Sequence, residues 1–118
     1  PRLRRFRMTV RCEDYDHVSV VSVSGELNAD TAEAYRTQID SRLARKVRFF
    51  VIDLEATTFI DSKGLEALLW TQEQCDEQLG QVRLCKPDDT CKKILQVTRL
   101  DGRFDVFSDV TEAVKTMR

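Results

Sequence analysis

A carboxylate, a hydroxyl and a cation stand on three consecutive residues near the middle of the chain. These are Asp61, Ser62 and Lys63, preceded by Phe59-Ile60 and followed by Gly64-Leu65. A serine in the first turn of a helix can carry a phosphate, because the free N–H groups and the positive end of the helix dipole favour an anion there. A phosphate brings about −1.5 to −2 charges. The segment therefore predicts a place where modification changes the surface charge without breaking the fold.

The local sequence predicts that a helix begins at this segment. Aspartate is a preferred N-cap residue, and with Asp61 in that position Ile60 and Leu65 take the two places of a hydrophobic staple. Apolar residues then recur at helical spacing until Gly80, a residue type that commonly ends a helix. Ser62 consequently falls in the first helical turn.

The same residues have a simpler interpretation, in which Asp61 and Ser62 serve only as helix caps. Gly64 favours a further role, since glycine inside a first turn costs up to about 1 kcal/mol relative to alanine. A close approach of a backbone, from a partner or from the chain's own loop, is one reason to retain a glycine there.

Carboxylates near one strand end raise the alternative of catalysis. Asp53, Glu55 and Asp61 could form a metal site or an acid/base site. The chain shows no Gly-rich phosphate loop and no metal-ligand spacing, and its single histidine, His17, falls in an early turn. We therefore expect no catalytic residue, no metal site and no cofactor.

The cysteines indicate free thiols in a reduced compartment. Their spacing does not give the close pairs of a zinc site, and two of them fall in apolar patterns, where a free thiol behaves as a small hydrophobic group. The four residues are Cys12, Cys75, Cys85 and Cys91.

Alternating strand and helix patterns surround these residues. Strands are predicted from period-two or continuous apolar runs, and helices from apolar residues at helical spacing. The predicted strands are Phe6–Cys12, Val18–Val23, Val47–Leu54, Gln81–Cys85 and Phe104–Phe107. Four helices are predicted to begin near Asp30, Asp61, Asp88 and Asp109. This order predicts an α/β fold with a mixed, mostly parallel sheet of four to five strands and right-handed crossovers.

Two details of this prediction concern local boundaries. The first two strands are expected to form a hairpin with a turn over Glu13–Asp16, and Ser24-Gly25 is expected to end the second strand. Asp30 is expected to be the N-cap of the first helix, with Glu33 completing a motif similar to the capping box.

Length and composition indicate one domain over residues 1–118. The chain has 118 residues, 42% hydrophobic and 33% charged, which suits a single core under a solvated surface. The 19 basic and 20 acidic side chains argue against a nucleic-acid binder. No run approaches the roughly 20 apolar residues of a membrane span, so we expect a cytoplasmic protein without membrane insertion.

The first residues carry an arginine-rich run over residues 1–7. We interpret it as a leader, a linker or the outward face of the first strand, with a phosphate-binding or membrane-surface arm as the alternative. Pro1 stands in place of a starting Met, so we expect the chain to begin inside a longer parent or at a cleavage scar.

Several segments together resemble the STAS domain family, and within it the bacterial anti-sigma factor antagonists. The likeness runs from about Met8 to the C-terminus. Its segments are Val23–Asn28, Val51–Leu54, Phe59–Leu65 and the closing Phe104–Val114.

This resemblance implies a short right-handed βα superhelix without catalytic residues. It also implies that a serine kinase, itself an anti-sigma factor, phosphorylates Ser62, that the unphosphorylated protein binds this kinase and frees a sigma factor, and that a serine phosphatase resets the switch. Asp61, Ser62 and Gly64 of the motif, with Asn28, would form the partner surface. Lys63, also expected at this surface, departs from the family pattern, in which small residues are common.

Other roles remain open from the sequence. The chain could be a constitutive subunit of a stressosome or of a lipid-transport complex, bound to other STAS subunits, with Ser62 only a cap. It could also be the excised tail of an anion transporter. Trp70 flanks the apolar stripe of the second long helix and either completes the core or marks a contact patch.

Overall fold

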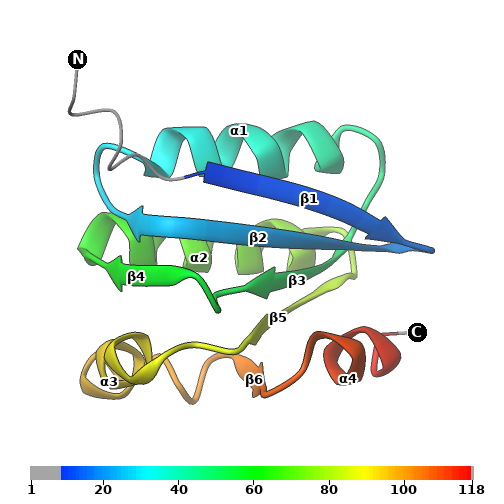
Figure 1. The fold of residues 1–118 in the computed structure, drawn as a ribbon. Helices are drawn as coiled ribbons and strands as arrows, with labels where there is room; N and C mark the ends of the chain where they lie inside the picture. Colours follow the sequence, from blue (N-terminus) through cyan, green and yellow to red (C-terminus); the bar gives the residue numbers. More distant parts are fainter. Residues whose placement is uncertain (1–8, 118) are drawn as a thin grey trace.

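A computed structural model describes residues 9–117 as one sheet with four helices (Figure 1). The predicted arm over residues 1–7, and the start of the predicted strand Phe6–Cys12, lie outside the described residues. The elements in chain order are β1 (Thr9–Tyr15), β2 (Val18–Leu27), α1 (Ala32–Leu43), β3 (Phe49–Asp53), β4 (Thr57–Ile60), α2 (Ser62–Glu77), β5 (Gln81–Cys85), α3 (Asp89–Val97), β6 (Asp105–Phe107) and α4 (Val110–Lys115).

The sheet is mixed and mostly parallel, as predicted. Its strand order is β1-β2-β3-β5-β6, with β4 paired to β2 beyond the end of β3. β1 is antiparallel to β2, and the other pairs are parallel. The four predicted helices are present, and the sheet has one strand more than the sequence suggested.

Both faces of the central strands are buried, which explains their continuous apolar runs. Val21 and Ile52 are register partners on the face covered by α1, α2 and α3, within the larger core. Val20 and Val51 are register partners on the opposite face, where Ala113 of α4 packs. The sheet is therefore the middle layer of the molecule.

The second strand is longer than predicted, and its additional residues pair with the additional strand, β4. Gly25 has a φ of 98°, and the register shifts between Gly25 and Glu26. Beyond this irregularity β2 pairs with β4, and the Thr57 hydroxyl donates a 2.7 Å hydrogen bond to the Val23 carbonyl. The prediction that Ser24-Gly25 ends the strand is therefore wrong, because glycine here redirects the pairing and does not stop it.

Two predicted boundaries also differ. β1 continues to Tyr15, and the turn is formed by Asp16 and His17, with Asp16 in the left-handed region at a φ of 63°. The N-cap of α1 is Thr31 and not Asp30, and its side chain makes no cap hydrogen bond to the helix. The capping box expected at Asp30 is therefore wrong, because the preceding Asn28 organises this turn.

The four helices of residues 9–117 are short relative to a bilayer. None of them is both long and apolar enough to cross a membrane.

Candidate functional site

The start of α2 is fixed by its own cap. Asp61 has extended backbone angles, and its Oδ1 accepts a 2.9 Å hydrogen bond from the Gly64 N–H. Ile60 and Leu65, the predicted staple residues, are both buried in the larger core. The predicted N-cap is therefore confirmed, and Ser62 is the first residue of α2.

Asp61 also ties α2 to the loop that follows β2. Its Oδ2 accepts a 3.2 Å hydrogen bond from the Ala29 N–H. Its own N–H donates a 3.1 Å hydrogen bond to the Leu27 carbonyl. One carboxylate thus holds two segments that are more than thirty residues apart in the chain, and it fixes the shape of the surface between them.

Asn28 organises that loop from within. Its Oδ1 accepts hydrogen bonds from the N–H groups of Asp30 and Thr31, at 2.9 and 3.2 Å. Its Nδ2 donates a 3.1 Å hydrogen bond to the Glu26 carboxylate. Because the next residue, Ala29, is bound to Asp61, the structure brings the predicted residues Asn28 and Asp61 into one local network.

Ser62 stands outside this network. Its side chain is exposed, and its hydroxyl has no hydrogen bond to any residue in the 9–117 range. Asp61 alone supplies the cap of α2. The interpretation of both residues as caps therefore holds for Asp61 and not for Ser62.

Lys63 and Gly64 differ sharply in exposure. The Lys63 Nζ lies 3.4 Å from the Glu66 carboxylate, and both side chains are more than half exposed, so this ion pair contributes little to stability. Gly64 is buried, and a Cβ at this position would overlap the Leu27 carbonyl and lie 2.9 Å from Ile60. The close approach that the glycine permits is thus made by the end of β2.

Phe59 is a neighbour to which sequence reasoning gave no role. It is a β4 residue, its side chain is 44% exposed, and it is the register partner of Glu26. Neighbouring strand residues point to opposite faces, so the exposure of Phe59 follows from the burial of Ile60 only once β4 is known to be a strand. An exposed aromatic ring three residues before Ser62 adds apolar area to this surface.

The carboxylates proposed for catalysis serve different partners. Asp53 accepts a 3.1 Å hydrogen bond from the Glu55 N–H, Glu55 forms a 3.0 Å ion pair with Lys86, and Asp61 caps α2. Within residues 9–117, no three His, Cys, Asp or Glu side chains are grouped so that they could hold a metal ion. The three carboxylates do not form one site.

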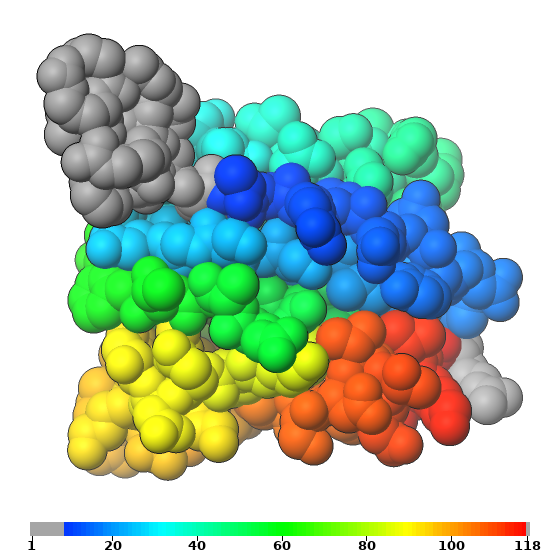
Figure 2. Space-filling view, in the orientation of Figure 1, coloured from blue at the N-terminus to red at the C-terminus, as the bar shows by residue number. Residues whose placement is uncertain are grey.

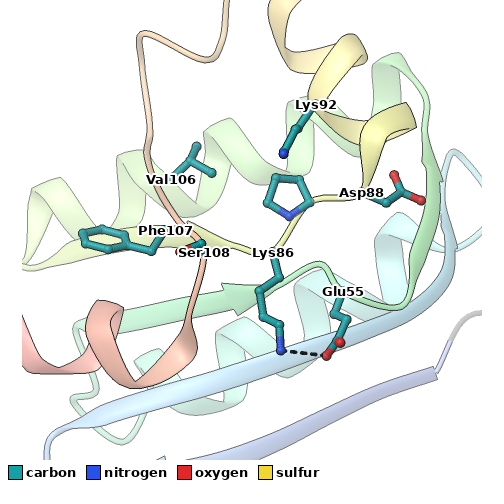
Figure 3. A pocket seen from close by; sticks show the side chains of 8 residues that line it. Glu55, Lys86, Asp88, Lys92, Val106, Phe107 and Ser108 are labelled. Atoms are coloured by element: carbon teal, nitrogen blue, oxygen red, sulfur yellow. Dashed lines mark ion pairs between the residues drawn. The ribbon is translucent and has the colours of Figure 1, made fainter.

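An open hollow of about 530 Å³ lies beyond the carboxyl ends of β3, β5 and β6 (Figure 3). The Lys86–Glu55 ion pair spans one side of it, and Lys92 and Asp88 add one charge of each sign to its lining. The lining residues are Glu55, Lys86, Pro87, Asp88, Lys92, Val106, Phe107 and Ser108. Its lining charges largely cancel, so we assign it no ligand.

The cysteine thiols are free, and three are buried. Burial raises the pKa of Cys75, Cys85 and Cys91 to about 12, since the interior disfavours the thiolate. They are therefore neutral core residues at physiological pH, and none is an activated nucleophile.

Trp70 packs against the core, the first of the two alternatives left open by the sequence. Its side chain is partly buried against the larger core. The Arg36 guanidinium lies 5.3 Å from the centre of its ring, a cation–π contact between α1 and α2.

Comparisons with known proteins agree with this fold. The model of the STAS domain matches residues 9–113. The anti-sigma-F factor antagonist RsfB of Mycobacterium tuberculosis is 30% identical over 94% of this chain and 90% of its own length. A crystal structure of an anti-sigma factor antagonist from Mycobacterium paratuberculosis is 32% identical, with a TM-score of 0.85 and 95% of each chain covered. The Bacillus cell fate determinant SpoIIAA, solved in its phosphorylated form, shares the fold at 22% identity and a TM-score of 0.74, with 93% of this chain and all of SpoIIAA covered.

Proposed function

The chain belongs to the STAS domain family, and on that premise we propose that it is a cytoplasmic anti-sigma factor antagonist acting by reversible binding and not by catalysis. In this proposal residues 1–118 form one STAS domain. Unphosphorylated, it binds an anti-sigma factor that is also a serine kinase, and a sigma factor is released. The kinase phosphorylates Ser62, binding is lost, and a serine phosphatase restores the hydroxyl.

The observation that carries this proposal is the free hydroxyl of Ser62 on a surface fixed without it. Asp61 caps α2 and holds the loop at Ala29, and neither contact involves the Ser62 hydroxyl. A phosphate at the first residue of α2 lies among free N–H groups and at the positive end of the helix dipole. We therefore expect phosphorylation to change binding and to leave the fold intact.

The effect on a partner follows from charge and hydration. The partner would meet a hydrated dianion beside the Asp61 carboxylate and the exposed ring of Phe59. Against an apolar or acidic partner surface, repulsion and desolvation oppose contact. In the proposal Asn28 and Gly64 act through the backbone they fix, and Lys63 moderates the added charge.

The direct test measures binding of the anti-sigma factor to variants at Ser62. We expect Ser62→Asp to weaken binding at least about tenfold, since it adds charge at the contact, and Ser62→Ala to bind as the unmodified protein does. Thr90→Asp is the matched control, because Thr90 is an exposed residue in the first turn of α3. Equal binding by Ser62→Asp and Ser62→Ala contradicts the proposal.

Phosphopeptide mapping of the protein from its own cells, growing and stressed, tests the modification itself. We expect phosphate on Ser62, with an occupancy that differs between the two conditions. Full coverage of the Phe59–Leu65 peptide without phosphate in either state would favour a constitutive STAS subunit instead.

A further inference from the structure

Basic side chains gather at the end of the sheet that lies far from Ser62. His17 in the β1–β2 turn, and Lys46 and Arg48 before β3, line a hollow of about 360 Å³ that also includes Phe49. Leu79, at the end of α2, lines an adjoining hollow of about 620 Å³ that shares Phe49. We call these five residues the basic-end surface.

The basic-end surface and Ser62 lie at opposite ends of β2. Val18, the first residue of β2, is the register partner of Phe49, and Leu27, the last, is the partner of Ile60 just before the cap of α2. Ten strand residues at about 3.3 Å each separate the two ends by roughly 30 Å. Figure 1 shows the hairpin tip at the right and the end of β4 at the left. A short segment bound at one end leaves the other end free.

The cations of this surface have few acidic partners. Within the part of the chain that the structure describes, Lys46 has no ion pair, and the Arg48 guanidinium donates to the Gln78 carbonyl at 3.3 Å and to no carboxylate. The chain from residue 41 to residue 52 contains no acidic residue. The nearby acids are Asp16, 3.8 Å from the His17 ring, and Asp76, in the adjoining hollow.

Three contacts hold the basic and aromatic groups together. The Arg48 guanidinium lies 5.3 Å from the centre of the Phe49 ring, and the His17 ring meets the same ring edge-on at 5.2 Å. The His17 Nε2 lies 2.7 Å from the Met117 carbonyl, so the hairpin is fixed against the end of α4. Figure 2 shows these two segments side by side, blue against red. His17 and Leu79 come from other elements than the loop that carries Lys46 and Arg48, so the favourable placement of cations after α1 does not by itself explain the cluster.

Leu79 gives this surface an apolar component. Its side chain is 83% exposed, and it follows α2 in the left-handed region at a φ of 60°. A small anion such as phosphate would contact the cations and leave Leu79 in water. A peptide with both acidic and apolar side chains would neutralise the cations and cover Leu79 and Phe49 together.

We propose that the basic-end surface binds an acidic segment of a partner protein that also carries apolar side chains. It is a second contact surface, separate from Ser62, and the inference does not depend on phosphorylation. A partner anchored there by its acidic segment keeps its other domains near the chain whether or not the Ser62 surface is engaged.

The test uses a short fluorescein-labelled peptide of mixed Glu and Leu residues, with a Gln-for-Glu peptide as its control. We expect the acidic peptide to shift the amide NMR signals of residues 17, 46, 48, 49 and 79, and the Gln peptide not to. Lys46→Glu with Arg48→Glu should weaken binding about tenfold, since two attractions become repulsions. Lys92→Glu with Lys93→Glu, an equal charge change on exposed α3 residues, should weaken it less than about twofold.

Three outcomes overturn the proposal. The two double variants could lose affinity equally, which would indicate attraction to overall charge. The NMR shifts could lie outside the basic-end surface. Inorganic phosphate could shift the same signals while the acidic peptide does not, which would make this a site for a small anion. Thermal melting of each variant establishes that it is folded before binding is measured.

Discussion

Two helices of this protein begin in nearly the same way, yet only one of them begins with a serine whose hydroxyl is exposed. Asp61 before α2 and Asp88 before α3 both adopt extended backbone angles, and each carboxylate accepts from the N–H three residues later, at 2.9 and 2.8 Å. The first helical residue is Ser62 in α2 and Asp89 in α3. An aspartate carries a permanent charge, whereas a serine gains one only by modification.

The two starts also differ in what the cap connects. The second oxygen of Asp61 binds the Ala29 N–H, while Asp88 makes a cap hydrogen bond to Cys91. The third helical residue is the tightly packed Gly64 in α2 and the buried Cys91 in α3. The cap hydrogen bond is common to both helices, so it reports only where a helix begins. The free Ser62 hydroxyl, next to a loop that Asp61 holds in place, is the feature that supports a function.

The largest expected difference is at the third helical residue. Gly64→Ala should lower the free energy of unfolding by about 3 kcal/mol, because the new methyl group overlaps the Leu27 carbonyl, a backbone atom that cannot move freely. Cys91→Ala should cost only about 1 kcal/mol, the loss of one small buried group. Urea unfolding measures both. Equal losses of stability in the two variants would show that the backbone of β2 shifts to accommodate the methyl group.

The second difference is between the cap residues themselves. Asp61→Ala should cost about 2 kcal/mol and Asp88→Ala about 1 kcal/mol, since the first removes both a cap and the hydrogen bond to Ala29, and the second removes a cap. Thermal melting of the two variants tests this order. A larger loss for Asp88→Ala would mean that the loop contact contributes nothing.

The third difference is in the response to pH. Burial raises the pKa of the Cys91 thiol to about 12, while α2 has no titratable group at the matching position. Above about pH 8.5 the unfolded chain loses this thiol proton and the folded protein keeps it, so the free energy of unfolding falls, by about 2 kcal/mol at pH 10. Cys75 and Cys85 add to the fall. Urea unfolding of Cys91→Ala should show a decrease at pH 10 that is about 2 kcal/mol smaller, and an identical decrease would contradict the assignment.

The smallest expected effect is that of Lys63. Lys63→Ala should change the free energy of unfolding by less than about 0.5 kcal/mol, because its pair with Glu66 is exposed. Combined with Ser62→Asp, it should deepen the loss of partner binding about twofold, since a nearby cation no longer offsets the added charge. Binding measured at low salt checks this. No added loss in the double variant would mean that Lys63 does not moderate the switch.

The helix starts could be predicted because their signals are local. Asp61 and the staple pair lie within six residues, and α2 begins where those residues indicate. The buried strand β3 was found from its continuous apolar run in the same way. The N-cap of α1 was predicted wrongly, because Asp30 with Glu33 matched the capping-box pattern. The hydrogen bond from the Thr31 N–H to Asn28 shows that Asn28 organises the turn and that α1 begins after Thr31.

The strand β4 could not be found from its own residues. It has four, of which Thr58 and Phe59 are exposed, so no clear apolar pattern marks it. It exists because β2 continues past Gly25 and offers Glu26 and Leu27 as partners. Such pairing between distant segments leaves no local signal, which is also why the basic-end surface, built from three separate loops, was not predicted.

The central position of β2 has a consequence for the order of folding. It pairs with β1, β3 and β4, and only β1 is its neighbour in sequence. The hairpin can close through a two-residue turn, whereas both parallel pairs wait for segments more than thirty residues further along, at a cost in loop-closure entropy. During synthesis, therefore, the edge of β2 that pairs with β3 and β4 stays unpaired until residue 60 has emerged, and the face of β2 that α4 covers stays open until Ala113 and Met117 have followed.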